Sequence, residues 1–337
     1  MPPIPLMRFG TLQPFLRYAS ACDERTLTVA EDAGLPLQVI SDPDALISGE
    51  RALHVANALS RKLSMADFGW RVGESTDLAE LGAFGLRILE APTLHAALAR
   101  AAEEFSQFNS ACVLRLEVED GVICLQHLLE RSERDEVAGQ AQQFALSLLL
   151  NIVRRYAGPQ WRPGRSKLPA NVFSYIPAEE AERNRLRPSD RCEASVTIAA
   201  SLLGLPLRSG AAGSGNGADW KGKPKLSHEF VQSVECVIHS MFGSGKITAD
   251  RVAKTGQMSV RSLHREMAAR DASFGHTLNR LRLRRAHTLL TASSMKIGEI
   301  ADFLGYAEQS NFNHAFRRWT GASPGAYRAL SRASSAR

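Results

Sequence analysis

Polar side chains of the kinds that read DNA bases are concentrated in two short segments near the C-terminal end of this 337-residue sequence. Arginine can form two hydrogen bonds with guanine, asparagine and glutamine can do the same with adenine, and serine can bond with either. We therefore expect both segments to contact base edges in the major groove. The candidate base contacts are Arg261, His264, Arg265, Gln309, Ser310, Asn313 and His314.

Cationic and hydroxyl side chains lie beside these segments and could bind the DNA backbone. Lysine, arginine and serine commonly hydrogen-bond to phosphate oxygens, and these contacts position a protein on DNA without reading its sequence. The candidate phosphate contacts are Lys246, Ser259, Arg270, Arg317 and Arg318.

Apolar residues in the same segments predict the helices that must present these side chains. Leu263 and Met267 are four residues apart, as are Phe312 and Phe316, so each pair lies on one face of a helix. If each pair docks on the preceding helix, the polar candidates remain on the exposed face. The aromatic residues are accordingly predicted to be core rather than base-stacking groups, together with Trp319 and Tyr327.

The two segments belong to an internal repeat. Val252-Ala253 and Ile300-Ala301 begin its copies 48 residues apart, and the second copy has one extra residue after its turn. Each copy has a short helix, a tight turn and a longer helix, which is the helix-turn-helix layout. We place the two units at 248–269 and 297–319. Two such units can enter successive major grooves if about 34 Å separates them.

Helical periodicity and glycine punctuation extend over the whole C-terminal half. It is predicted to be all-α, with a long helix joining the two units. The predicted helices are 227–241, 248–255, 259–269, 274–292, 297–304 and 309–319.

Charge divides the chain in the same place. The net charge is +6, but the last 117 residues carry 19 basic and 8 acidic residues, whereas the first 220 carry 22 and 27. Small and flexible residues followed by a basic run make 209–225 a flexible linker. We therefore predict an effector-binding or dimerisation domain over 1–208 and a DNA-binding domain over 226–337.

The first domain is predicted to be α+β, with helices and a small antiparallel sheet. Alternating residues on either side of Glu119-Asp120-Gly121 predict a hairpin of 113–118 and 122–127. The remaining predicted elements are helices at 48–63, 93–108, 137–156 and 178–187 and strands at 171–175 and 194–198.

Residues 247–328 resemble the DNA-binding domain of the AraC/XylS family of bacterial transcription regulators. The matching segments are Arg282–Leu290, Ile297–Tyr306, Gln309–Phe312, Phe316–Pro324 and Tyr327–Arg328. The resemblance implies two helix-turn-helix units held by one long helix on adjacent segments of promoter DNA. One position departs from the family: Gln257 stands where the turn glycine is usual, so the first unit could turn differently.

Residues 20–207 resemble the arabinose-binding-type sensory domain of one branch of that family. The resemblance implies a sensory role and leaves the effector and its binding residues unknown. The supporting segments are Leu81–Gly85, Ala91–Leu94, Ala97–Leu98, Trp161–Pro163 and Leu202–Leu207.

Several other kinds of site are disfavoured. Five scattered cysteines form no C-x-x-C pair, and His264 and His314 have no partner at metal-ligand spacing, so we expect neither a metal nor a cofactor. Gly243–Thr248 lacks the glycine and hydroxyl spacing of a phosphate-binding loop, and Thr248 is instead expected to cap a helix. The apolar stretch 144–153 is too short to cross a bilayer. In the first domain, histidines 54, 95 and 127 are expected to be structural, and a redox link between Cys112 and Cys124 is disfavoured.

These observations predict a cytoplasmic, non-enzymatic, sequence-specific transcription regulator, most simply an activator. Its expected partners are double-stranded promoter DNA, RNA polymerase (implied by the resemblance), a small-molecule effector and a second copy in a homodimer, but no membrane. Two alternatives stay open. The N-terminal domain could serve only to oligomerise a constitutive regulator, or the chain could be a DNA-repair enzyme that shares the helical domain.

Overall fold

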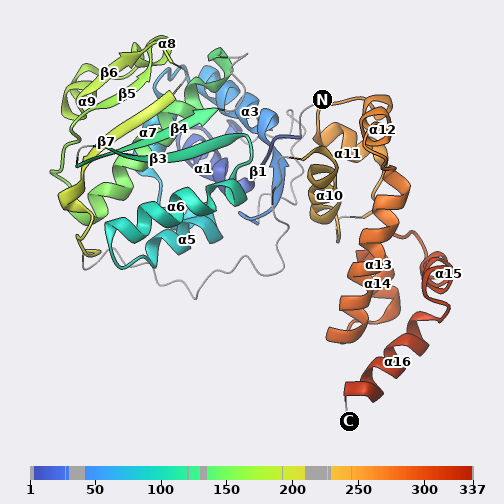
Figure 1. Cartoon of the computed structure of the whole chain (residues 1–337). Coiled ribbons are helices and arrows are strands. Elements are labelled where there is room, and N and C mark those ends of the chain that lie inside the picture. The colour runs from blue at the N-terminus through green and yellow to red at the C-terminus, as the bar shows by residue number, and fades with distance from the viewer. Residues whose placement is uncertain are drawn as a thin grey trace. The chain divides into compact units, whose positions relative to one another are not determined.

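The computed structural model describes residues 4–26, 28–29, 42–119, 121–129, 135–191, 193–208, 226, 229–243 and 245–335. The chain divides into two compact units, Pro5–Leu226 and a second formed by Met1–Ile4 with Ser227–Arg337 (Figure 1). The predicted linker 209–225 lies outside the described residues. The predicted fold classes, an α+β N-terminal part and a helical C-terminal part, are confirmed.

A five-stranded sheet forms one layer of the N-terminal unit, in the order β3-β4-β7-β5-β6. The predicted hairpin is confirmed, because β3 pairs antiparallel with β4 and Leu116 lies opposite Leu125. Strand β7 extends the sheet antiparallel to β4, and β5 pairs with β6 in parallel. The strands are β3 (Cys112–Glu119), β4 (Val122–Leu129), β5 (Ser166–Pro169), β6 (Leu186–Ser189) and β7 (Glu193–Ala199).

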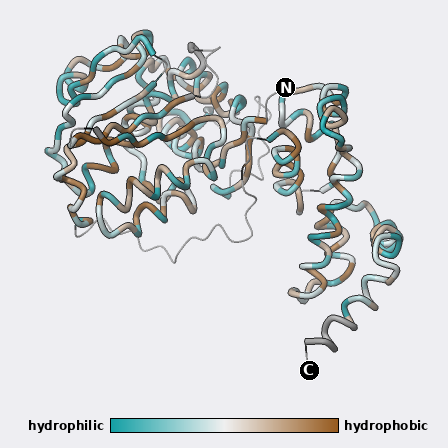
Figure 2. Tube along the Cα trace, in the orientation of Figure 1, coloured by the Kyte–Doolittle hydropathy of each residue, from teal (hydrophilic) through white to brown (hydrophobic). Residues whose placement is uncertain are grey.

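Helices pack around this sheet (Figure 1) and supply most of the apolar core. Figure 2 shows hydrophobic residues interspersed with hydrophilic ones along these helices. The three longest were predicted from their periodicity and are confirmed, and Ser48 and Thr93 cap two of them through their hydroxyls. The α-helices are α1 (Gln13–Cys22), α3 (Gly49–Lys62), α4 (Phe68–Ser75), α5 (Ala83–Leu89), α6 (Leu94–Phe108), α7 (Asp135–Ala157), α8 (Ala170–Phe173) and α9 (Ala178–Arg183). The short 3-10 helices are η1 (Phe9–Thr11), η2 (Glu24–Thr26), η4 (Leu78–Leu81) and η6 (Ala200–Leu202).

A second, two-stranded sheet was not predicted. It pairs β1 (Leu6–Arg8) antiparallel with β2 (Leu46–Ser48), far apart in the sequence. The side chain of Arg8 is buried there and is satisfied by carbonyl oxygens: its Nε atom donates to Gln107 O at 2.9 Å and its Nη1 atom to Asp44 O at 2.7 Å. These hydrogen bonds offset the cost of removing a guanidinium from water.

The strand predicted at 171–175 is wrong, since α8 occupies its first residues. Five residues of mixed apolar and polar character do not distinguish a strand from one turn of helix, and contacts elsewhere in the fold decide. The strands on either side of this segment are β5 and β6. They were not predicted, because each contains a proline, Pro169 or Pro188, and proline argues against a strand. The helix predicted at 178–187 ends early, at Arg183.

Cys112 and Cys124 do not meet across the hairpin. Cys112 lies opposite Leu129, whereas Cys124 lies opposite Glu117, five residues further along β3. At roughly 3.3 Å per residue this offset places the two cysteines well beyond disulfide range. Neither cysteine forms a disulfide bond.

The described residues of the C-terminal unit form helices joined by turns and loops and include no strand, as predicted. Thr248, Ser259 and Ser273 cap three of its helices through their hydroxyls, including the helix that Thr248 was expected to cap. A further helix, α16, was not predicted. The helices are α10 (Phe230–Ser240), α11 (Ala249–Thr255), α12 (Val260–Ala268), α13 (Phe274–Ala292), α14 (Ile297–Phe303), α15 (Gln309–Thr320) and α16 (Pro324–Ser335).

Candidate nucleic-acid interface and N-terminal cavity

The turns of the two helix-turn-helix units have the same hydrogen bonds. After α11, Gln257 N donates to Lys254 O at 3.2 Å and Met258 N donates to Ala253 O at 2.9 Å. After α14, Gly305 N donates to Asp302 O and Tyr306 N donates to Ala301 O, both at 3.0 Å. The second turn therefore repeats the first at an offset of 48 residues, the offset of the sequence repeat.

The glutamine at position 257 does not change the conformation of the first turn, although a residue other than glycine there could have made this unit turn differently. Its φ is 50°, in the left-handed region, and the φ of Gly305 at the equivalent position is 76°. A side chain at such a φ costs roughly 1–2 kcal/mol because its Cβ crowds the neighbouring carbonyl oxygen. The first unit thus adopts the family's turn with a residue that is strained in it.

The predicted docking faces are confirmed. Leu263 and Met267 on α12 are 0% exposed, and so are Phe312 and Phe316 on α15. Around the second unit, Trp319 and Tyr327 are half-buried and pack against the edge of the apolar cluster that contains Phe312 and Phe316. This packing turns the opposite face of each helix outward.

Six of the seven candidate base contacts are exposed on these outward faces. Only Asn313 is half-buried: its Oδ1 atom is shielded from solvent and has no hydrogen-bond partner among the described residues. A bidentate contact with adenine needs both amide atoms, so Asn313 has to turn its side chain to make one. The exposed six are Arg261, His264, Arg265, Gln309, Ser310 and His314.

Two of the candidate arginines are held by one carboxylate. Arg265 Nη2 lies 3.2 Å from Glu266 Oε1, and Arg270 Nη1 lies 3.1 Å from Glu266 Oε2. The Glu266 side chain is 12% exposed, and that of Arg265 is 68% exposed. A phosphate or base that binds these guanidinium groups must therefore compete with Glu266.

The other candidate phosphate contacts are all exposed: Lys246 before α11, and Arg317 and Arg318 in the last turn of α15. Ser259 differs from these residues because its side chain already has a partner: the hydroxyl caps α12 by accepting a hydrogen bond from Ser262 N at 3.0 Å. It can offer a phosphate its backbone N–H or a shared hydroxyl.

Arg282 holds the second turn in place and was not among the residues predicted from the sequence. From α13 its Nε atom donates to Leu304 O at 2.9 Å and its Nη2 atom donates to Gly305 O at 3.0 Å. The guanidinium also lies over the Tyr306 ring, 4.2 Å from its centroid. Burial lowers the pKa of Arg282 and raises the pKa of Tyr306. Arg282 thereby fixes the second turn to the connecting helix, and its place in a matched segment was the only sequence signal.

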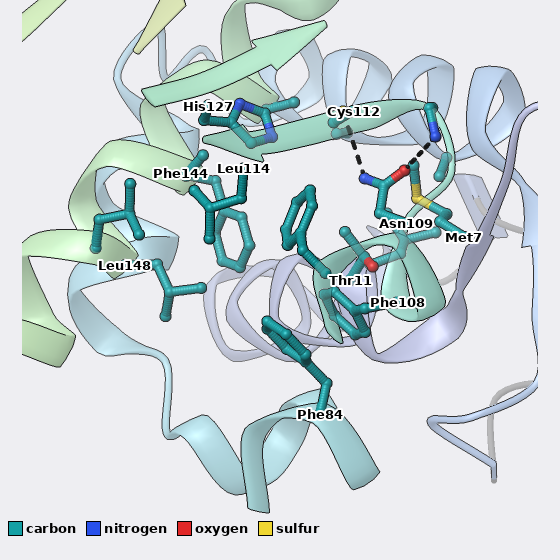
Figure 3. A pocket seen from close by; sticks show the side chains of 18 of the residues that line it. Met7, Thr11, Phe84, Phe108, Asn109, Cys112, Leu114, His127, Phe144 and Leu148 are labelled. Atoms are coloured by element: carbon teal, nitrogen blue, oxygen red, sulfur yellow. Dashed lines mark hydrogen bonds between the residues drawn. The ribbon is translucent and has the colours of Figure 1, made fainter. Parts of the chain in front are cut away.

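The N-terminal unit contains a cavity of about 80 Å³ between helices α1, α3, α6 and α7 and the β3–β4 hairpin (Figure 3). Its walls are mainly phenylalanine, leucine and alanine side chains. His127 of β4 lies in this wall, 5% exposed, with Nδ1 3.2 Å from Gln142 Oε1. Burial lowers the pKa of His127 to about 4, so its ring is neutral at pH 7.

The part of the chain that the structure describes holds no group of three or more His, Cys, Asp or Glu side chains arranged to bind a metal ion. Within the same residues, no helix combines the length and apolar character needed to cross a membrane.

Comparison with known proteins identifies both units. Residues 252–330 match the helix-turn-helix domain family, and residues 25–186 match the family described as the arabinose-binding domain of AraC transcription regulators, N-terminal. Together the two matches account for most of the chain.

Similar proteins include the HTH-type transcriptional regulator VirS of Mycobacterium tuberculosis, 24% identical over 88% of each chain. VqsM of Pseudomonas aeruginosa, another HTH-type transcriptional regulator, is 40% identical over 76 residues, or 23% of each chain. The crystal structure of the transcriptional regulator CdpR from Pseudomonas aeruginosa aligns with 81% of this chain and 91% of that chain, at 20% identity and a TM-score of 0.37.

The matched family regions coincide with the repeated helix-turn-helix turns and with the α+β unit that precedes them. The chain therefore belongs to the AraC family of DNA-binding transcription regulators, with an arabinose-binding-type N-terminal domain.

Proposed function

We propose that the protein activates transcription from specific promoters and that a small effector bound to its N-terminal domain controls this activity. The observation that carries the DNA-binding part is the repeat of two turns with the same hydrogen-bond pattern, each followed by a helix with a buried apolar face and an exposed polar face. The cavity in the N-terminal unit supports the effector part.

In this proposal α12 and α15 enter successive major grooves. Their exposed polar residues read bases, and Lys246, Arg270, Arg317 and Arg318 bind phosphates, with Ser259 contributing at the start of α12. The excess of basic residues in the last 117 residues favours this interface, since each neutralised phosphate releases counterions. The domain limits remain as we predict them, 1–208 and 226–337 with a linker between.

Control by an effector is a shift of population. An effector changes DNA occupancy only if it binds the DNA-engaged form of the protein with an affinity different from that for the free form. We further propose that the protein acts in the cytoplasm, as a homodimer that contacts RNA polymerase at the promoter.

The first test is selection of bound fragments from genomic DNA by the full-length protein, followed by measurement of affinity for the enriched site and for a scrambled one. We expect a ratio of at least about a thousandfold between the two affinities. Equal affinities would contradict sequence-specific regulation. Transcription from the selected promoter with purified RNA polymerase then separates an activator from a repressor.

A second candidate function of the N-terminal domain is dimerisation without effector binding. In that case the thermal stability of the full-length protein should depend on protein concentration and should not respond to any added small molecule. Effector control predicts stabilisation by a ligand at constant protein concentration, together with a change in DNA affinity.

A further inference from the structure

We propose that the N-terminal cavity is the effector site and that it takes a small, uncharged, mainly apolar molecule with an aromatic ring and one hydroxyl group, such as an aromatic alcohol or a phenol. This inference rests on the proposed effector control and gives the effector a chemical class. It departs from the sugar after which the N-terminal family is described.

The walls of the cavity favour an aromatic ligand. Phe84 and Phe108 stack with ring centroids 4.4 Å apart, and Phe105 meets the His127 ring edge-to-face at 5.7 Å. Figure 3 shows labelled side chains from several elements, among them Phe84, Phe108, Phe144, Leu114 and His127, around a common space. Rings packed in this manner offer faces and edges to another ring.

The cavity wall lacks the charged groups that an ionic ligand would need. None of the described residues that line the cavity has a carboxylate, an ammonium or a guanidinium group, and the His127 imidazole is neutral at pH 7. A carboxylate or an amine placed there would be buried without a counter-ion, at a large cost in desolvation. Amino acids and organic acids are therefore poor candidates.

The polar groups of the cavity are few, which excludes sugars. Both atoms of the Asn109 amide already form a local hydrogen bond: Oδ1 accepts from Ala111 N at 2.9 Å and Nδ2 donates to Cys112 Sγ at 3.5 Å, which leaves at most one further donor and one further acceptor. A sugar would bring four or more hydroxyl groups into a space that cannot satisfy them.

Two other polar groups of the wall are placed to bind a single hydroxyl. The Thr11 Oγ1 atom is shielded from bulk solvent and has no hydrogen-bond partner among the described residues. With Nδ1 of the neutral His127 ring donating to Gln142 Oε1, Nε2 is left as an acceptor. A ligand hydroxyl can accept from Thr11 or donate to His127, and either contact would orient it.

The volume sets the size. A cavity of about 80 Å³ holds roughly six water-sized groups, so the fitting molecules have about six to ten non-hydrogen atoms. Benzyl alcohol is a probe of this size, and benzoate is its anionic counterpart of nearly equal shape.

The experiment measures binding of benzyl alcohol, phenol, sodium benzoate, L-arabinose and L-ornithine to the full-length protein by calorimetry at pH 7.5. We expect saturable binding of benzyl alcohol or phenol, and binding of benzoate at least about a hundredfold weaker. Equal binding of benzoate, tighter binding of arabinose or ornithine, or no binding of either neutral aromatic probe would overturn the inference.

Variants locate the binding. Thr11→Val keeps the side-chain volume and removes the hydroxyl, so affinity for the neutral probe should fall about threefold to tenfold while the melting temperature does not fall. Ala145→Leu fills the cavity from α7 and should abolish binding, whereas Ala157→Leu makes the same change on the same helix outside the cavity and should not. Unchanged binding in both Thr11→Val and Ala145→Leu would place the probe elsewhere and refute the proposed site.

The same probes distinguish the ligand class proposed for the cavity from effector control as such. If a neutral aromatic probe binds in the cavity but leaves affinity for the selected DNA site unchanged, the site stands and control by such ligands fails. If arabinose or ornithine changes DNA affinity while the aromatic probes do not bind, effector control stands and the proposed ligand class is wrong.

Discussion

Gln257 and Gly305 occupy the same place in two copies of one turn, with φ values of 50° and 76° and matching backbone hydrogen bonds on either side. Only one of the two residues suits that backbone. Since a left-handed conformation is unfavourable for a residue with a Cβ atom, the first unit stores strain that the second does not.

Replacement of Gln257 by glycine is therefore expected to stabilise the protein. We expect Gln257→Gly to raise the free energy of unfolding by about 1 kcal/mol relative to Gln257→Ala, which also removes the side chain but keeps the Cβ atom. Urea unfolding of both full-length variants measures the difference. An alanine variant as stable as the glycine variant would show that the turn carries no strain.

The converse change at Gly305 should be more damaging. An added Cβ atom would lie 2.8 Å from the backbone oxygen of Gly245, in addition to the unfavourable φ. We expect Gly305→Ala to lower the free energy of unfolding by about 2 kcal/mol or more, from strain and overpacking combined. The same urea titration tests this prediction. If Gly305→Ala lost no more stability than an alanine substitution on the surface, the backbone at Gly305 could not lie as close to the Gly245 oxygen as the structure places it.

Base and phosphate contacts should differ in their response to mutation. Arg265→Ala is expected to cost about 1–3 kcal/mol on the preferred site and to relax base preference at one position. Arg318→Ala should weaken binding to all sequences alike and reduce the salt slope by about one. Fluorescence anisotropy on the preferred and scrambled sites at several salt concentrations separates the two. If Arg265→Ala kept both its affinity for the preferred site and its base preference, the assignment of Arg265 as a base contact would be wrong.

Removal of the Glu266 carboxylate should strengthen DNA binding. Glu266→Gln leaves Arg265 and Arg270 without the anion that competes with DNA, so we expect affinity for scrambled DNA to rise about threefold and the salt slope to steepen. Asp302→Asn is the matched control, because Asp302 is exposed on α14 and forms no ion pair within the described residues. An equal gain in both variants would indicate a general charge effect rather than release of the two arginines.

Stability should fall in mild acid because of His127. Its pKa is lowered to about 4 by burial, while in the unfolded chain it has its ordinary value of about 6.5. Below pH 6.5 the unfolded state binds a proton that the folded state does not, so stability is complete above pH 6.5 and is lost as the pH falls toward 4, by about 3 kcal/mol in total.

Urea unfolding of the full-length protein and of His127→Gln at pH 7.5 and pH 4.5 checks this prediction. The variant lacks the titrating group, so its loss of stability between the two pH values should be smaller. Parallel losses in the two proteins would mean that other groups cause the acid sensitivity.

Local patterns in the sequence were sufficient for the helix-turn-helix repeat. The four-residue spacing of Leu263 with Met267 and of Phe312 with Phe316 depends only on helical geometry, so the buried faces, and with them the outward polar faces, could be predicted. Hydroxyl caps such as Thr248 and the alternation of the β3–β4 hairpin are likewise local signals.

Contacts between residues far apart in sequence were decided only by the tertiary structure. The bond from Arg282 to Leu304 O, the partner strand of β1 and the helical state of α8 depend on neighbours that no local pattern names. The cavity belongs to the same class, because an alanine or phenylalanine that lines an empty space has the same sequence spacing as one that fills a core. The sequence alone determined which faces are apolar, and the packing of those faces decided where they close completely and where they leave room for a ligand.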